Sequence, residues 1–199
     1  KFNIYSYKSK SLEDNTYKSL EFSYILCKKN ICKGIITLPL RKDLIIKKID
    51  KNFIGQTEFF QKKDRKRYSN MILYHDKVLI TPLTTHLEIK KVSDKISNKD
   101  FLYNQFLNIH MTLVNDFGFK KPKIIISGLN PHAGENGKIG NEEQTFILPV
   151  IKKLKKNKIH LDGPFSADCI LNTKNIKVYD CFVFTYHDQA LIPFKYISK

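Results

Sequence analysis

The sequence GLNPHAGENGKIGNEE, residues 128–143, decides how the rest of this chain is interpreted. An apolar run at 124–126 precedes it and is typical of a buried strand, and a helical pattern at 145–156 follows it. Between the two lie glycines, a proline, a histidine and acidic residues. Open α/β sheets bind their ligands beyond the carboxyl ends of the strands. The stretch therefore predicts a ligand-binding loop at such an edge.

Strand and helix patterns alternate on both sides of this loop. Apolar runs predict buried strands at residues 32–38, 77–81, 123–127 and 177–184. Helical spacing predicts helices at 12–29, from Thr57, from a cap at 97–100 to Gly118, and at 145–156. Residues 161–168, with Asp-Gly-Pro, are predicted to form a loop. This alternation favours an α/β fold, with a mostly parallel sheet and helices on its faces.

The charge of the chain favours neither nucleic acid nor membrane as a partner. The formal net charge is +16 over 199 residues, but only three of the basic residues are arginines. Arginine is the usual residue for forked contacts to bases and phosphates, so the lysines are expected to form a solvated surface. No run approaches the roughly 18 apolar residues of a membrane span. With no signal peptide recognised, we expect a cytoplasmic location.

The cysteines show no metal-binding or redox spacing. Cys27, Cys32, Cys169 and Cys181 form no CxxC pair and no zinc-finger pattern. In a chain of this length we expect reduced thiols, several of them buried.

Three histidines follow predicted strands. His86, His132 and His187 each lie just beyond the carboxyl end of an apolar run, so a parallel sheet would bring them to one edge. Three neutral imidazoles suit a divalent ion such as zinc and leave one position open for substrate. Asp188, Asp168 or Glu135 are candidate acceptors that orient the rings. The alternative is that these are ordinary loop histidines, bound to water or to neighbouring groups.

Several motifs resemble one family, in that family's order along the chain. They are Thr37-x-Pro39-x-x-Lys42, Thr84-Thr85-His86-Leu87, the stretch from Gly128 to Glu135, Gly163-Pro164 with Ala167-Asp168, and Tyr186-His187-Asp188-Gln189 with Lys195. Together they are similar to the 4-hydroxythreonine-4-phosphate dehydrogenases of vitamin B6 biosynthesis, from about Leu20 to Lys195.

The resemblance implies an architecture. It implies a three-layer α/β/α fold in two lobes with a cleft, like that of isocitrate and isopropylmalate dehydrogenases. Residues 1–60 would belong to the first lobe, and residues 61–199 would form the second lobe with the metal-binding loops. It also implies a homodimer with its active site at the subunit interface. The family's terminal motifs are absent, so the chain is expected to be a fragment lacking both ends.

The resemblance also implies a chemistry. A divalent metal (Zn, Co or Mg) would be held by His86, His132 and His187, one of them contributed across the dimer. Gln56, Thr57 and Lys195 would bind a small phosphorylated substrate, with Lys195 and Asp188 catalytic. The family oxidises 4-phosphooxy-L-threonine with NAD or NADP, and decarboxylation to 3-amino-2-oxopropyl phosphate follows. The residues that bind the nicotinamide cofactor are not identified by the motifs.

Other functions stay open. Gln56 stands where the family usually has a histidine, and this favours, as one alternative, a dehydrogenase of another phosphorylated hydroxy acid. A second alternative is a hydrolase in which three histidines and a metal-bound water act without NAD. A third is a lysine-rich nucleic-acid binder, whose affinity would fall steeply with salt.

Overall fold

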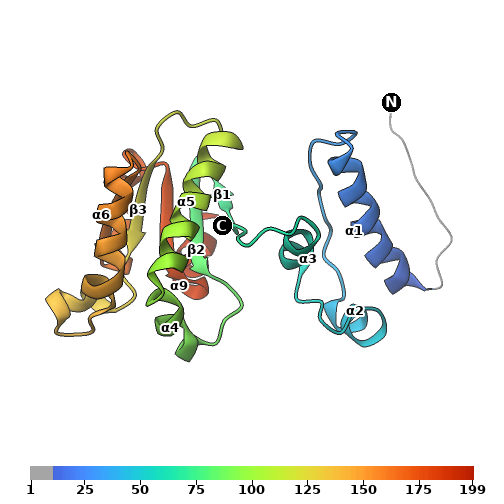
Figure 1. Cartoon of the computed structure of the whole chain (residues 1–199), viewed down its shortest axis with the longest axis horizontal. Helices are drawn as coiled ribbons and strands as arrows, with labels where there is room; N and C mark the ends of the chain where they lie inside the picture. The colour runs from blue at the N-terminus through green and yellow to red at the C-terminus, as the bar shows by residue number, and fades with distance from the viewer. Residues whose placement is uncertain (1–10) are drawn as a thin grey trace. The chain divides into compact units, whose positions relative to one another are not determined.

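The computed structural model describes residues 11–199, which divide into two compact units at Ser69 and Asn70 (Figure 1). Residues 1–10 of the predicted first lobe lie outside the described residues. Each unit has its own buried apolar side chains.

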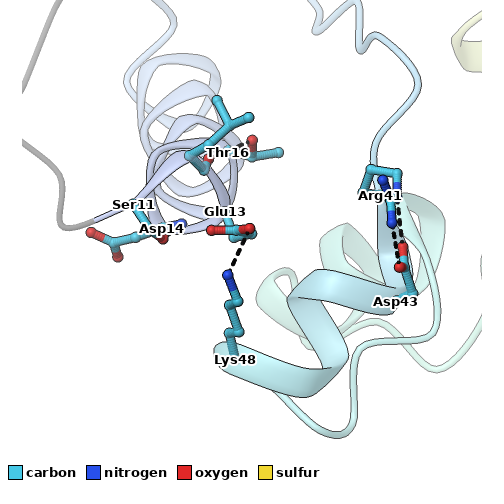
Figure 2. Close-up of polar contacts among 8 residues, drawn as sticks. Ser11, Glu13, Asp14, Thr16, Arg41, Asp43 and Lys48 are labelled. Carbon is cyan, nitrogen blue, oxygen red and sulfur yellow. Dashed lines mark hydrogen bonds and ion pairs between the residues drawn. The ribbon is translucent and has the colours of Figure 1, made fainter.

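The first unit contains three helices, α1 (Leu12–Lys28), α2 (Lys42–Lys48) and α3 (Gln56–Lys63). The side chain of Ser11 caps α1 by accepting a hydrogen bond from the Asp14 amide at 3.1 Å. Lys48 of α2 donates to Glu13 of α1 at 3.0 Å (Figure 2). The core of this unit consists of Leu20, Ile45, Phe53 and Phe59. The predicted helices at 12–29 and from Thr57 are confirmed.

The predicted strand at residues 32–38 is wrong. The segment has no regular structure, and the side chains of Ile36 and Leu38 are 98% and 81% exposed. An apolar run becomes a buried strand only when a neighbouring strand pairs with its amide and carbonyl groups. In the described part of the first unit no strand is present to do so.

The second unit contains a five-stranded sheet in the order β1-β2-β5-β3-β4. The strands are β1 (Leu73–His75), β2 (Val78–Thr84), β3 (Lys123–Ser127), β4 (His160–Phe165) and β5 (Cys181–Tyr186). All neighbouring pairs are parallel except β1 with β2, which is antiparallel. The prediction of a mostly parallel α/β sheet is confirmed. The last strand in the sequence, β5, lies in the middle.

Helices cover both faces of this sheet. The helices are α4 (Val92–Ile96), α5 (Lys99–Asn115), α6 (Leu148–Lys156), α7 (Ala167–Ile170), α8 (Thr173–Ile176) and α9 (His187–Ile197), with short turns η1 (Ile89–Lys91), η2 (Pro131–Gly137) and η3 (Glu143–Ile147). Ile124 and Ile126 of β3 pack into the same cluster as Phe106 of α5, whereas Ile125 packs on the other face with Ala190 of α9. Burial on both faces explains why β3 is a continuous apolar run.

The predicted loop at residues 161–168 is wrong in its first half. Residues 160–165 form β4, in which Leu161 pairs with Ile124 of β3. The amide of Gly128 also donates to the carbonyl of Phe165 at 2.7 Å. Pro164 is compatible with a strand here because β4 is at the edge of the sheet that residues 11–199 form, where one side needs no ladder partner. Pairing in the sheet therefore overrides local turn preference.

The strand predicted at 177–184 is displaced to Cys181–Tyr186, because residues 173–176 form the short helix α8, capped by the side chain of Asn172. The basic stretch 62–67 is exposed, as predicted. No helix among residues 11–199 is both long and apolar enough to cross a membrane.

The expectation that several thiols are buried is wrong, because Cys181 alone is buried; Cys32 and Cys169 are exposed. Burial raises the pKa of the Cys181 thiol to about 12. A hydrogen bond with Asp168 raises the pKa of Cys169. Since the thiolate is the reactive form, we expect a thiol reagent to modify Cys32 first, Cys169 more slowly, and Cys181 only after unfolding. Mass spectrometry of the native and denatured protein checks this order; rapid native labelling of Cys181 would contradict the buried position of β5.

Candidate functional site

The three candidate histidines lie beyond the carboxyl ends of three parallel strands. The strands β2, β3 and β5 end at Thr84, Ser127 and Tyr186. His187 follows its strand at once, and His86 follows two residues after Thr84. His132 follows β3 through a four-residue connection, residues 128–131. The predicted placement of all three at one edge of the sheet is therefore confirmed.

Within one chain the three rings divide between two cavities. The rings of His86 and His187 lie with centroids 6.1 Å apart and line one cavity. His132 lines a second cavity together with Asp168. Tyr186 contributes to both. Among residues 11–199 no three His, Cys, Asp or Glu side chains gather closely enough to hold a metal ion. A single subunit thus supplies a pair of imidazoles and a separate third one.

His187 is oriented in the way that a metal ligand needs. Its Nδ1 lies 2.7 Å from Oδ1 of Asp188. A carboxylate can only accept, so Nδ1 donates and Nε2 of the neutral ring keeps its lone pair. Histidines that bind metals are commonly oriented by such a carboxylate. The predicted role of Asp188 as an acceptor for a histidine ring agrees with this geometry.

The loop that carries His132 is wound in the left-handed sense. Residues 132–136 have φ values of 51°, 50°, 79°, 43° and 57°, and four of them are not glycine. His86 also has a positive φ, of 45°. Each non-glycine residue in this region costs on the order of 1 kcal/mol, so the surrounding structure must hold the loop in place. Such backbone strain is found most often at functional sites.

Glu143 is the group that holds this loop. Glu143 is 1% exposed, and its Oε1 accepts hydrogen bonds from the amides of Leu129 and Asn130, both at 2.8 Å. Its Oε2 accepts from Nδ2 of Asn130 at 3.0 Å. A Cβ added to Gly134 would lie 2.7 Å from that same oxygen, so the loop can approach only because this position is glycine. Glu143 is the first residue of η3, and from there its carboxylate reaches beneath the loop.

Glu142 also forms a hydrogen bond with the same loop. Its Oε1 accepts from the hydroxyl of Ser93 at 2.6 Å, and its Oε2 accepts from Nδ2 of Asn130 at 2.8 Å. These two hydrogen bonds lower the pKa of the Glu142 carboxyl below its usual value, and the bond from Ser93 has the larger effect. Asp168, beside His132, also has a lowered pKa, chiefly because the Ser166 hydroxyl donates to it. Both carboxylates therefore stay ionised at neutral pH.

The candidate substrate residues are divided between the two units. Gln56 and Thr57 begin α3 of the first unit, where Nε2 of Gln56 donates to the carbonyl of Leu38 at 3.0 Å. A Cβ added to Gly55 would lie 3.2 Å from Nζ of Lys42, so the two motifs of this unit lie side by side. Lys195 is exposed on α9 of the second unit, two helical turns after His187.

Comparisons with known proteins agree with these motifs. A family model described as pyridoxal phosphate biosynthetic protein PdxA matches residues 5–199. A 4-hydroxythreonine-4-phosphate dehydrogenase of Sulfurihydrogenibium sp. is 38% identical over 162 residues, which is 81% of this chain and 49% of that protein. One from Vibrio vulnificus is 36% identical over 181 residues, which is 90% of this chain and 54% of that protein.

Solved structures of 4-hydroxythreonine-4-phosphate dehydrogenases are also similar to this chain. The 4-hydroxythreonine-4-phosphate dehydrogenase of Klebsiella pneumoniae has a TM-score of 0.83 at 26% identity, over 93% of this chain and 56% of that one. The corresponding structure from Burkholderia phymatum has a TM-score of 0.80 at 28% identity, over 94% of this chain and 56% of that one. The chain thus spans about half the length of the curated relatives it matches.

Proposed function

Because this chain belongs to the pyridoxal phosphate biosynthetic protein PdxA family, we propose that the full protein oxidises 4-phosphooxy-L-threonine with NAD or NADP in a metal-dependent reaction. Decarboxylation to 3-amino-2-oxopropyl phosphate, on the route to pyridoxal 5'-phosphate, completes the proposed reaction. The observation that carries the proposal is the placement of His86, His132 and His187 beyond three parallel strands of one sheet. The two-lobed architecture of isocitrate dehydrogenases is part of the same proposal.

The metal site in this proposal is completed by a second subunit. His86 and His187 line one cavity and His132 lines another, so one chain by itself does not surround an ion with three imidazoles. In a symmetric dimer each interface site can combine ligands from both chains. The exposed positions of His86 and His132 leave them accessible to such a partner. This arrangement supports a homodimer with its active site at the interface.

The chemistry that the residues supply fits an alcohol oxidation. A divalent ion, when bound, supplies a Lewis acid next to the substrate hydroxyl. Asp188 keeps the proton on Nδ1 of His187, so the lone pair of Nε2 is the one that would bind the ion. The exposed ammonium group of Lys195 can pair with a substrate carboxylate or phosphate. In the first unit, Lys42 and Thr57 offer a cation and a hydroxyl suited to an anionic group.

Turnover by the full-length protein tests this proposal. We expect reduction of NAD or NADP with 4-phosphooxy-L-threonine and Co²⁺, Zn²⁺ or Mg²⁺, and loss of turnover after treatment with a chelator. Readdition of metal should restore the rate, which separates metal removal from damage to the protein. No cofactor reduction with any of the three metals would contradict the proposal, and hydrolysis of a phosphorylated substrate without NAD would favour the three-histidine hydrolase.

Gln56 favours one alternative substrate class. An amide cannot carry the charge of the histidine that the family usually has, and Nε2 of Gln56 already donates to Leu38. This difference at a proposed phosphate contact favours, as second candidate, a dehydrogenase of another phosphorylated hydroxy acid. Comparing kcat/KM for 4-phosphooxy-L-threonine and for a phosphorylated four-carbon sugar acid decides between the two.

A further inference from the structure

A line of buried polar side chains connects the three strand ends that precede the histidines. Thr84, Ser127 and Thr185 are at most 5% exposed and lie at or next to the ends of β2, β3 and β5. The hydroxyl of Thr84 donates to the carbonyl of Thr185 at 2.9 Å and so joins β2 to β5. Buried polar groups in a sheet are retained where they fix a particular arrangement, because each must find a partner.

Gln189 joins β5 to β3. Its Oε1 accepts from the amide of Thr185 at 3.0 Å, from the Thr185 hydroxyl at 2.8 Å and from the Ser127 hydroxyl at 2.9 Å. Its Nε2 donates to the carbonyl of Gly128 at 3.1 Å. Gly128 is the first residue of the connection to His132, and Gln189 is two residues after His187. One side chain therefore spans from the start of α9 to the start of the loop at residues 128–137, which carries His132 and is called the His132 loop below.

The hydrogen bonds require an amide at this position. The Thr185 amide can only donate, so the atom facing it must be an oxygen. The Gly128 carbonyl can only accept, so the atom facing it must carry hydrogen. A carboxylate of the same shape would satisfy the first contact and would place two acceptors against each other at the second.

We propose that Gln189 is a positioning residue that fixes the His132 loop relative to His187, and thereby sets the affinity of the metal site without binding the metal. This rests on the proposed function as far as the metal is concerned. The positioning itself concerns the loop alone and can be measured without metal. Residues that orient ligands in this way typically change metal affinity by about 10- to 100-fold when replaced.

The first measurement is hydrogen exchange in the metal-free full-length protein. We expect Gln189→Ala and Gln189→Glu to increase exchange of the amides at residues 128–137, and Tyr196→Ala, an exposed change on the same helix, to leave it unchanged. Gln189→Glu tests the need for an amide, because it keeps the shape and loses the donor to Gly128. Unchanged exchange in Gln189→Ala, or wild-type exchange in Gln189→Glu, would overturn the proposed positioning role.

The second measurement is a Co²⁺ titration of the same variants, followed by the absorption of the bound ion. We expect affinity to fall by about 10- to 100-fold in both Gln189 variants and to stay at the wild-type value in Tyr196→Ala. A lower melting temperature with unchanged Co²⁺ affinity would show that Gln189 only stabilises the fold, and would overturn its link to the metal. If the wild type binds no Co²⁺, the proposed function and this link fall together, whereas the exchange data still decide the positioning role.

Discussion

Replacing His132 with alanine is expected to weaken Co²⁺ binding to the full-length protein by more than about 100-fold, because a direct ligand is lost rather than a group that only orients one. Turnover with NAD or NADP should fall with it. His160→Ala is the matched control, because His160 is exposed at the amino-terminal end of β4, away from the proposed site. Absorption titration with Co²⁺ measures the affinity, and unchanged binding in His132→Ala would contradict the assignment of this residue.

Mixing two inactive variants tests whether the ligands come from two subunits. His132→Ala and His187→Ala dimers should each be inactive. After exchange of subunits, half of the dimers are mixed, and in each of these one of the two sites has a full set of ligands. About one quarter of the wild-type activity should therefore return. If all three histidines belonged to one chain, every site would carry a substitution and mixing would restore nothing.

Replacing Glu143 with alanine is expected to lower the free energy of unfolding by about 3–6 kcal/mol. The amides of Leu129 and Asn130 would lose a charged acceptor, and hydrogen bonds to charged groups contribute about 1.5–3 kcal/mol each. The left-handed loop at residues 132–136 would also lose the group that holds it against its own strain.

Urea denaturation of the full-length protein measures this loss. Gln144→Ala is the matched control, since Gln144 is the exposed neighbour of Glu143 in the same turn and should change stability by less than about 0.5 kcal/mol. An equal effect of the two substitutions would show that Glu143 does not hold the loop.

The sequence was sufficient for the three inner strands of the sheet, β2, β5 and β3, and for the placement of the histidines. Continuous apolar runs such as residues 123–127 predict strands buried on both faces, and β3 has those bounds. The end of each run then places the residues that follow it at the carboxyl edge. This reasoning needs only local pattern and the rule that parallel strands share an edge, which is why His86, His132 and His187 could be found.

What local pattern could not predict depends on contacts distant in sequence. Residues 32–38 have the composition of a buried strand, but Ile36 is exposed because burial requires a neighbour that composition cannot specify. Residues 160–165 contain Gly163 and Pro164, which indicate a turn, yet these residues pair with β3 as an edge strand. Glu143 and Gln189 lie within the quoted motifs, but their roles depend on partners that the motifs do not reveal. Glu143 accepts from Asn130, 13 positions away, and Gln189 accepts from Ser127, 62 positions away.

The position of β5 has a consequence for how the second unit folds during synthesis. Residues 181–186 fill the space between β2 and β3, which do not pair with each other in the sheet. Until these residues leave the ribosome, the inner edges of both earlier strands remain open, and unpaired edges invite wrong pairing. The five-stranded sheet can therefore be completed only after residues 181–186 have been synthesised.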